Sequence, residues 1–226
     1  MDLLLIRHGE STHNVPGVDP TLEPDPPLTD RGRRQTAAAA LALRREGFRP
    51  AAIHCGPQLR ALETASALRA ALACPVHVDP DLCECGGLGA VSGRGRSELE
   101  SAWPGYHFAD SVREEGWWRG GEADTDVQRF HERAAVALAR LTERHGPNRD
   151  RVVVVTHGRF GSALLAQLLG DAPHAFNRYC LDNTGMALVE RRPRADIAFR
   201  ATDSTEIAVR LRWCNRLDHL SRELRT

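Results

Sequence analysis

Two segments of the chain end in a histidine followed by a glycine, each after a run of aliphatic residues. The first is DLLLIRHG, which contains Arg7 and His8, and the second is VVVVTHG, which contains His157. A short apolar run bounded by polar residues is typical of a strand that is buried on both faces of a sheet. Ligands of parallel α/β sheets bind at the carboxyl ends of the strands. If the two strands are neighbours, we expect the two histidines to face each other across one crevice.

Arginine side chains add a second feature to this expected crevice. Arg7 precedes His8, and Arg60 lies in the first turn of a predicted helix. The guanidinium group offers a fixed fork of donors that matches phosphate oxygens and keeps its charge at any relevant pH. A lone histidine at a strand end is more often a hydrogen-bonded structural residue. Two histidines and two arginines together, however, predict a pocket for a phosphate group.

The elements that must position these side chains alternate between strands and helices. Apolar runs predict strands over 2–6, 51–55, 75–79 and 151–158, with two more near 186–190 and 207–213. Helical composition and capping signals predict helices over 29–47, from Pro57 as the first helical position, from a capping box of Thr125 and Gln128 to Gly146, and over 160–169. This alternation predicts an α/β fold, a three-layer sandwich with a mostly parallel central sheet and helices on both faces.

Residues 81–121 interrupt the alternation and show no sustained periodicity. The segment is rich in glycine and contains Trp103, Trp117 and Trp118. We expect residues 1–226 to form one domain, with this segment inserted as a lid or cap. Its aromatic side chains would then form either an apolar lid that selects the ligand or a satellite core under a long loop.

The composition of the chain argues against nucleic acids and membranes as binding partners. Lys and Arg total 30, as do Asp and Glu, so the formal net charge is zero and a broad nucleic-acid footprint is not expected. No run reaches the roughly 20 apolar residues that span a bilayer, and the start of the chain has no signal-peptide pattern. Six cysteines lack the Cys-x-x-Cys pairs of zinc ribbons and redox motifs. These features predict a cytoplasmic protein with reduced thiols and no membrane partner.

Five sequence blocks, in order, resemble the histidine phosphatase superfamily, also called the phosphoglycerate mutase-like family. They are Arg7-His8-Gly9-Glu10, Leu28-Thr29 with Gly32 and Gln35, Arg60 in CGPQLRALETA, Glu84 in DLCECGG, and Thr156-His157-Gly158. The resemblance extends from residue 2 to about residue 190. It implies an α/β sheet fold and chemistry through a phosphohistidine, with no metal and no cofactor.

The resemblance also implies roles for individual residues. His8 would be the nucleophile, with Arg7, Arg60 and His157 around the phosphoryl group, and Asn14 would add a phosphate contact. Glu84 matches the proton donor of the family. Glu122 in GGEADTD is a rival donor, because relatives also carry an acidic residue before this helix, and Glu10 is a third candidate.

The expected activity is hydrolysis of a phosphate monoester on a small phosphorylated molecule. A phosphoglycerate mutase-type transfer to a second hydroxyl is one alternative, and a phospho-ligand binder without turnover is another. The phosphate-binding residues do not identify the leaving group. A homodimer also stays open at this point.

Overall fold

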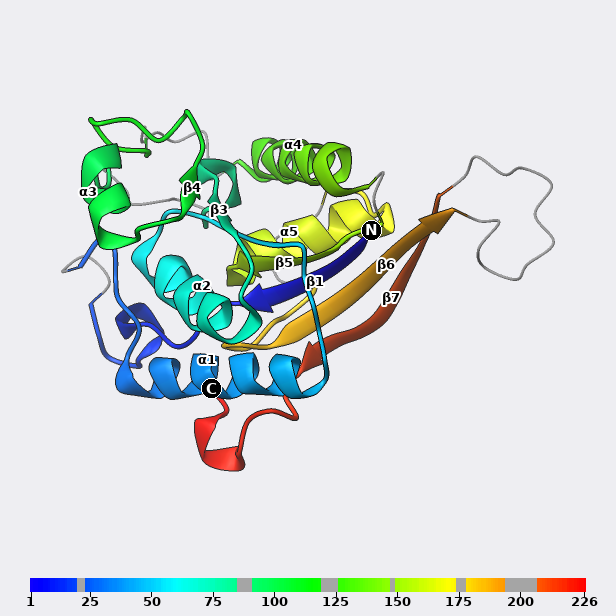
Figure 1. Cartoon of the computed structure of the whole chain (residues 1–226), viewed down its shortest axis with the longest axis horizontal. Coiled ribbons are helices and arrows are strands. Elements are labelled where there is room, and N and C mark those ends of the chain that lie inside the picture. The colour runs from blue at the N-terminus through cyan, green and yellow to red at the C-terminus, as the bar shows by residue number, and fades with distance from the viewer. Residues whose placement is uncertain (20–22, 85–90, 119–125, 147–148, 174–177, 194–206) are drawn as a thin grey trace.

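A sheet of seven strands forms the centre of the part of the chain that the structure describes (Figure 1). The structure is a computed structural model, and it describes residues 1–19, 23–84, 91–118, 126–146, 149–173, 178–193 and 207–226. In sheet order the strands are β4 (His107–Phe108), β3 (Val76–Val78), β2 (Ala52–Cys55), β5 (Arg151–Thr156), β1 (Asp2–Arg7), β6 (Met186–Pro193) and β7 (Ile207–Arg216).

Most neighbouring strands of this sheet are parallel. The pairs β1–β5, β5–β2, β2–β3 and β3–β4 are parallel, whereas β6 pairs antiparallel with β1, and β7 pairs antiparallel with β6. The sheet is therefore mixed but mostly parallel, which confirms the predicted α/β class. The antiparallel direction of β6 matters for the site, because it brings the start of β6 to the carboxyl end of β1.

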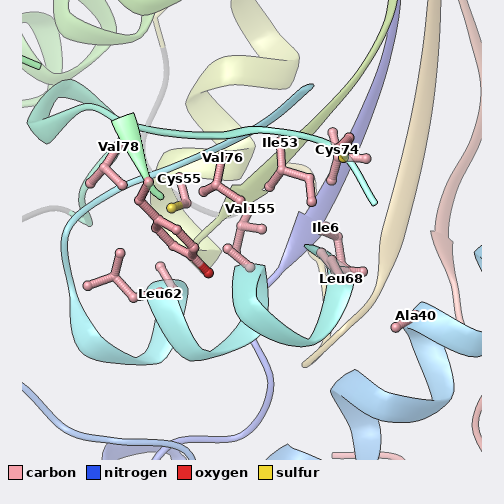
Figure 2. Packing of buried hydrophobic residues seen from close by; sticks show 14 of the residues in the cluster. Ile6, Ala40, Ile53, Cys55, Leu62, Leu68, Cys74, Val76, Val78 and Val155 are labelled. Carbon is pink, nitrogen blue, oxygen red and sulfur yellow. The ribbon is translucent and has the colours of Figure 1, made fainter. Parts of the chain in front are cut away.

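Helices cover both faces of the sheet (Figure 1). Alternate residues of β1 point to opposite sides, so Leu4 and Ile6 pack with α1 (Asp30–Arg45) and α2 (Leu59–Leu72). Figure 2 shows this cluster between α2 and the strands. Leu3 and Leu5 pack with α4 (Val127–His145) and α5 (Gly158–Leu169) on the other side. The result is the predicted three-layer arrangement.

Each of the four predicted helix starts is wrong by one or two residues, and α1 begins at Asp30 and α5 at Gly158. Helix α2 begins at Leu59, and Gln58 precedes it as an N-cap in extended conformation, so Pro57 lies outside the helix. Helix α4 begins after Asp126, whose side chain accepts hydrogen bonds from the backbone N–H groups of Gln128 and Arg129. A carboxylate is favoured at this position over a hydroxyl because it also interacts with the positive end of the helix dipole.

The segment predicted to lack regular structure contains two short elements. Helix α3 (Arg96–Ala102) and strand β4 lie within it, and β4 extends the sheet beside β3. Elements of seven and two residues are too short to show a sequence period. The side chains of Tyr106, Phe108 and Trp117 are buried in the same cluster as α2, so they belong to the core. A lid function for residues 81–121 stays a prediction, and residues 85–90 and 119–121 lie outside the described part.

A row of histidines crosses three strands at one edge of the sheet. His54, His77 and His107 are register partners on β2, β3 and β4, and their rings stack with centroids 5.0 and 4.9 Å apart. His54 Nε2 lies 2.9 Å from Nε2 of His145 on α4, and His145 Nδ1 lies 2.8 Å from Asp150 Oδ2. Burial lowers the pKa of His54 well below its ordinary value. The row lines a cavity of about 510 Å³ under α4.

We expect this row to make the stability of the protein fall in acid. The pKa of His54 is lowered in the folded protein, so the unfolded chain binds more protons below about pH 6.5, and the free energy of unfolding decreases as the pH falls. Each buried imidazole that stays neutral lowers the free energy of unfolding by about 1.4 kcal/mol for every pH unit below this value. Urea unfolding at about pH 7.5 and about pH 5 measures how much the free energy of unfolding decreases between these two pH values. This decrease should be smaller by about 2 kcal/mol in His54→Gln than in the wild type.

The exposed neighbour His107 offers a matched control, because His107→Gln should keep the wild-type dependence on pH. If the free energy of unfolding decreases equally in His54→Gln and in the wild type, the His54 imidazole does not cause the loss of stability in acid.

Candidate active site

The pairing of β1 with β5 brings the two histidines together. Arg7 is the register partner of Thr156, and the backbone N–H of His8 donates to the carbonyl of Thr156 at 3.0 Å. The rings of His8 and His157, the next residues along each strand, have centroids 5.1 Å apart. The predicted crevice is therefore present at the carboxyl ends of these strands.

A pocket of about 370 Å³ opens next to His8. Its walls contain the predicted residues Arg7, His8, Asn14, Arg60 and Glu84, together with Ser11, His13, Gly158, Arg159, Cys180, Leu181 and Asp182. His157 is fully buried beside His8 and does not line the pocket. The structure thus gathers the whole predicted set, with one member behind the pocket wall.

His8 is held as a neutral imidazole with a defined tautomer. Nδ1 lies 2.7 Å from the carbonyl oxygen of Gly9, which only accepts, so Nδ1 carries the proton. Arg60 Nε donates to His8 Nε2 at 3.2 Å, so Nε2 presents its lone pair. Burial lowers the pKa of His8 well below its ordinary value of 6.5, and the charges of Arg60 and Arg7 lower it further. Nε2 is therefore unprotonated at neutral pH, and its lone pair can attack once Arg60 Nε releases it.

Two arginines supply positive charge to the pocket. Arg7 comes from the end of β1 and donates through Nη1 to the carbonyl of Leu181 at 2.9 Å, whereas Arg60 comes from the first turn of α2. Burial lowers the pKa of both guanidinium groups, and the nearby carboxylate of Glu84 acts in the opposite direction. Arginine still keeps its proton at any relevant pH, so both groups can bind phosphate oxygens.

His157 is a buried imidazole whose nitrogens can serve a ligand. Neither ring nitrogen has a hydrogen-bond partner among the described residues, and the side chain is fully buried. Burial lowers its pKa well below 6.5, and the neighbouring charge of Arg60 acts in the same direction. Buried polar atoms usually find a partner, which makes a phosphoryl oxygen beside His8 a suitable acceptor for one of these nitrogens.

Glu84 is positioned by the amino end of α5. Its two carboxylate oxygens accept hydrogen bonds from the backbone N–H groups of Arg159 and Phe160, each at 3.0 Å. Its own backbone N–H donates to Gln58 Oε1 at 2.8 Å, which ties it to the start of α2. The N-cap of α5, His157, makes no side-chain cap, so Glu84 satisfies these amides instead. This arrangement suits a carboxylate that faces the pocket.

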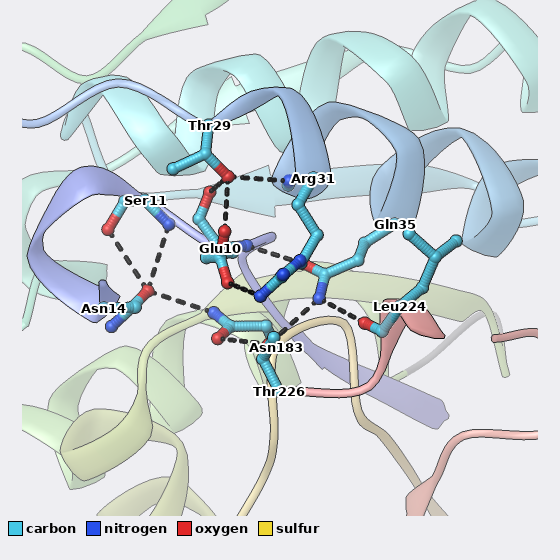
Figure 3. Close-up of polar contacts among 10 residues, drawn as sticks. Glu10, Ser11, Asn14, Thr29, Arg31, Gln35, Asn183, Leu224 and Thr226 are labelled. Carbon is cyan, nitrogen blue, oxygen red and sulfur yellow. Dashed lines mark hydrogen bonds and ion pairs between the residues drawn. The ribbon is translucent and has the colours of Figure 1, made fainter. Parts of the chain in front are cut away.

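The two rival acids have different positions. Glu10 is buried, but its carboxylate accepts from the Thr29 hydroxyl at 2.6 Å and pairs with Arg31 at 3.1 Å (Figure 3), and it does not line the pocket. It serves the amino end of α1. Glu122 lies outside the described residues.

Comparison with known proteins agrees with this geometry. The sequence pattern of the family described as Histidine phosphatase superfamily (branch 1) matches residues 3–201. The chain belongs to the histidine phosphatase superfamily. The match contains the strand-end histidines, both arginines and Glu84, so the five sequence blocks were sufficient to predict the family.

Several members of the superfamily are similar to this chain. A metal-independent phosphoserine phosphatase of Arabidopsis thaliana is 31% identical over 162 residues, which is 70% of this chain and 64% of that protein, so the match spans less than two thirds of its length. A 2,3-bisphosphoglycerate-dependent phosphoglycerate mutase of Thermoplasma acidophilum is 26% identical over 83% of this chain and 86% of its own. The structure named mycobacterial hydrolase 2 superposes with a TM-score of 0.62 at 25% identity, covering 99% and 94% of the two chains.

The sequence interpretation missed one wall of this histidine phosphatase site. Cys180, Leu181 and Asp182 line the pocket from the segment before β6, and Arg159 lines it from α5. The segment lies at the pocket because β6 runs antiparallel to β1. Strand direction cannot be read from an apolar run, so the only available signal was the turn-forming DNTG before the predicted strand.

We expect Arg60 to control the protonation of His8. The charge of Arg60 lowers the pKa of His8, so Arg60→Met should raise that pKa. A nitrogen-15 NMR titration of the His8 ring measures the change directly. Arg140→Met is the matched control, because Arg140 is an exposed cation on α4 that pairs with Asp79 and Asp81 and should leave His8 unchanged. A pKa of His8 that stays the same or falls in Arg60→Met contradicts the assignment.

Proposed function

We propose that this protein is a phosphatase that hydrolyses a phosphate monoester through a phosphohistidine on Nε2 of His8. The observation that carries the proposal is the neutral imidazole of His8, whose lone pair lies next to the guanidinium of Arg60 in a pocket that also contains Arg7. Nucleophilic catalysis needs a deprotonated attacking atom, and phosphoryl transfer needs positive charge around the phosphorus. Membership of the histidine phosphatase superfamily supports the same chemistry.

In the first half-reaction, His8 Nε2 attacks phosphorus as the bond to the leaving oxygen breaks. Arg7 and Arg60 stabilise the equatorial oxygens of the transition state, and His157 reaches one of them when its ring turns from its buried position beside His8 into the pocket. Glu84 takes up a proton when the monoanionic form of the ester binds, and it gives this proton to the leaving oxygen. Because both oxygens of Glu84 accept amide hydrogen bonds, one of them must exchange its amide for the leaving oxygen in this step.

In the second half-reaction, water attacks the phosphohistidine. Glu84, now a carboxylate, accepts a proton from this water, the N–P bond breaks, and the electron pair returns to Nε2 of His8. Inorganic phosphate leaves, and Glu84 is again protonated for the next ester. The amides at the start of α5 hold the carboxylate in place for this role.

The dimensions and charges of the pocket suit a small polar substrate. A volume of about 370 Å³ accommodates a phosphorylated metabolite, and Arg159 and Asp182 place both signs of charge beyond the phosphate position. Mutase chemistry is the second candidate, favoured by the similarity to the archaeal phosphoglycerate mutase. An assay with monophosphoglycerate separates these two activities. A phosphatase releases inorganic phosphate from it, whereas a mutase isomerises it in the presence of 2,3-bisphosphoglycerate.

The proposal includes catalysis without a metal ion and a location in the cytoplasm. Arg7 and Arg60 already provide the positive charge that a metal would otherwise supply, and they would repel a cation. Cys55, Cys74 and Cys214 are free thiols, as a reducing compartment favours. No helix in the described part of the chain has the length and apolar character to cross a membrane. A homodimer stays a proposal that sedimentation analysis tests.

We expect His8→Ala to abolish both turnover and phosphoenzyme formation, because it removes the unprotonated nitrogen that lies against Arg60 in the pocket. The measurement is labelling with a phosphorus-32 ester followed by alkaline gel analysis, since phosphohistidine survives base. The loss of activity should exceed about 10⁴-fold, and the far-UV circular dichroism should stay unchanged.

An EDTA-treated wild type is the control and should keep its activity. Labelling of the His8→Ala protein, or activity lost in EDTA and restored by magnesium or zinc, is incompatible with the proposed mechanism.

We expect Glu84→Gln to slow hydrolysis of alkyl phosphates by about 10²–10⁴-fold, because their leaving oxygen needs a proton as the bond breaks. A p-nitrophenolate departs unprotonated, so the variant should form phosphohistidine from p-nitrophenyl phosphate and then stall, since it lacks a base for water. Rapid-mixing kinetics should show a burst of nitrophenol followed by slow turnover.

Glu122→Gln is the matched control, and thermal unfolding checks that α5 stays folded when the amide replaces the carboxylate. If Glu122→Gln shows the dependence on the leaving group and Glu84→Gln behaves as wild type, the proton donor is Glu122.

A further inference from the structure

A buried asparagine outside the five sequence blocks connects two parts of the candidate active site. Asn183 lies just before β6 and is 3% exposed. Its Nδ2 group donates two hydrogen bonds of 3.1 Å, one to the backbone carbonyl of His8 and one to Oδ1 of Asn14. Figure 3 shows the bond to Asn14. One side chain therefore contacts both the segment of the nucleophile and an asparagine that lines the pocket.

These contacts fix the orientation of the Asn14 amide. Its Oδ1 also accepts from the backbone N–H of Ser11 at 3.1 Å and from the Ser11 hydroxyl at 3.2 Å. A backbone N–H can only donate, so Oδ1 must face Ser11, and Nδ2 of Asn14 is on the other side of the amide. A flipped amide would place Nδ2 against two N–H groups. Ser11 and Asn183 thus keep Asn14 as a hydrogen-bond donor toward the pocket.

Asn183 is itself held from the opposite side. Its Oδ1 accepts from the hydroxyl of Thr226 at 3.1 Å, and Gln35 Nε2 donates to that hydroxyl at 2.9 Å and to the carbonyl of Leu224 at 2.7 Å (Figure 3). Gln35 Oε1 then accepts from the backbone N–H of Glu10 at 2.8 Å. Both ends of the Asn183 amide therefore have partners, and its rotation would break several hydrogen bonds at once.

We propose that Asn183 is a positioning residue for phosphoryl binding. It holds the amide of Asn14 so that Nδ2 donates to an oxygen of the phosphoryl group. This inference rests on the proposed function. A donor stabilises developing charge only where it is preorganised, and a rotated Asn14 would present an acceptor oxygen to phosphate and repel it. Asn183 acts through Asn14 and does not itself contact the substrate.

A double-mutant cycle tests this coupling. Asn14→Ala, Asn183→Ala and the double variant are compared in kcat/KM for p-nitrophenyl phosphate and in Kd for inorganic phosphate by calorimetry. Removal of one donor to a transition state typically costs about 10²–10³-fold, so Asn14→Ala should lower kcat/KM by about that factor. In the wild-type background, Asn183→Ala should lower kcat/KM by about tenfold or more. In the Asn14→Ala background, the same substitution should lower kcat/KM by less than about twofold.

A purely structural role gives a different pattern. Two independent effects would multiply, so a double variant whose loss equals the product of the single losses overturns the inference. Thr142→Val is the matched control, because it removes a hydroxyl on α4 that donates to the carbonyl of Leu138 at 2.7 Å and does not line the pocket, and it should retain wild-type kcat/KM within about twofold. Asn183→Ser replaces Asn183→Ala if thermal unfolding shows that the alanine variant does not fold.

The calorimetric measurement of phosphate binding distinguishes a failure of this inference from a failure of the proposed function. A wild type that binds phosphate but turns over no ester overturns the proposed function alone, and the cycle on Kd then decides the role of Asn183. A wild type that neither binds phosphate nor releases it overturns both.

Discussion

Parallel hydrogen bonding between β1 and β5 is the constraint on which the site depends. The ladder runs in register from Asp2 opposite Arg151 to Arg7 opposite Thr156, so both strands end at the same level. Both strands are buried on both faces, and the residues that follow them are therefore also removed from water. In that environment an imidazole stays neutral, and a guanidinium acts on it more strongly than it would at the surface. Burial thus favours the neutral imidazole of His8 and strengthens the effect of the Arg60 charge on it.

The same burial would be unfavourable without compensating charges. Arg60 is a buried cation and Arg7 a half-buried one, and the carboxylates that act on them are Glu84, Asp182 and Asp25. Asp25 is fixed by a hydrogen bond from the backbone N–H of Leu59 at the start of α2, so the anion and the Arg60 cation share one helix end. A phosphoryl group that enters the pocket meets cations whose negative partners are placed around its edge. The balance keeps the protein folded and leaves the pocket attractive to an anion.

The sequence was sufficient for the elements that carry a strong local signal. Apolar runs predicted the strands around His8 and His157, and the motif order predicted that Arg60 and Glu84 would meet them. Three kinds of information were not available from it. The direction of β6 depends on pairing across the chain, the start of α2 depends on the extended backbone of Gln58, and β4 is too short to show a period. The contacts of Asn183 join residues as far apart as 14 and 226, and such distant hydrogen bonds have no local signature.

The start of α5 couples two of the functional side chains. His157 is the N-cap of this helix, and the amides of Arg159 and Phe160, two and three residues later, bind Glu84. A displacement of this helix end would therefore move the second histidine and the candidate acid together. Gly158 lies between them, and a Cβ atom there would come within 3.8 Å of the Arg7 guanidinium and 3.9 Å of Glu84 Oε2. These are ordinary contact distances, so a larger side chain would extend into the space that the phosphoryl group needs. A glycine after the second histidine therefore leaves room in front of the helix end whose amides hold Glu84, as the proposed phosphoryl position requires.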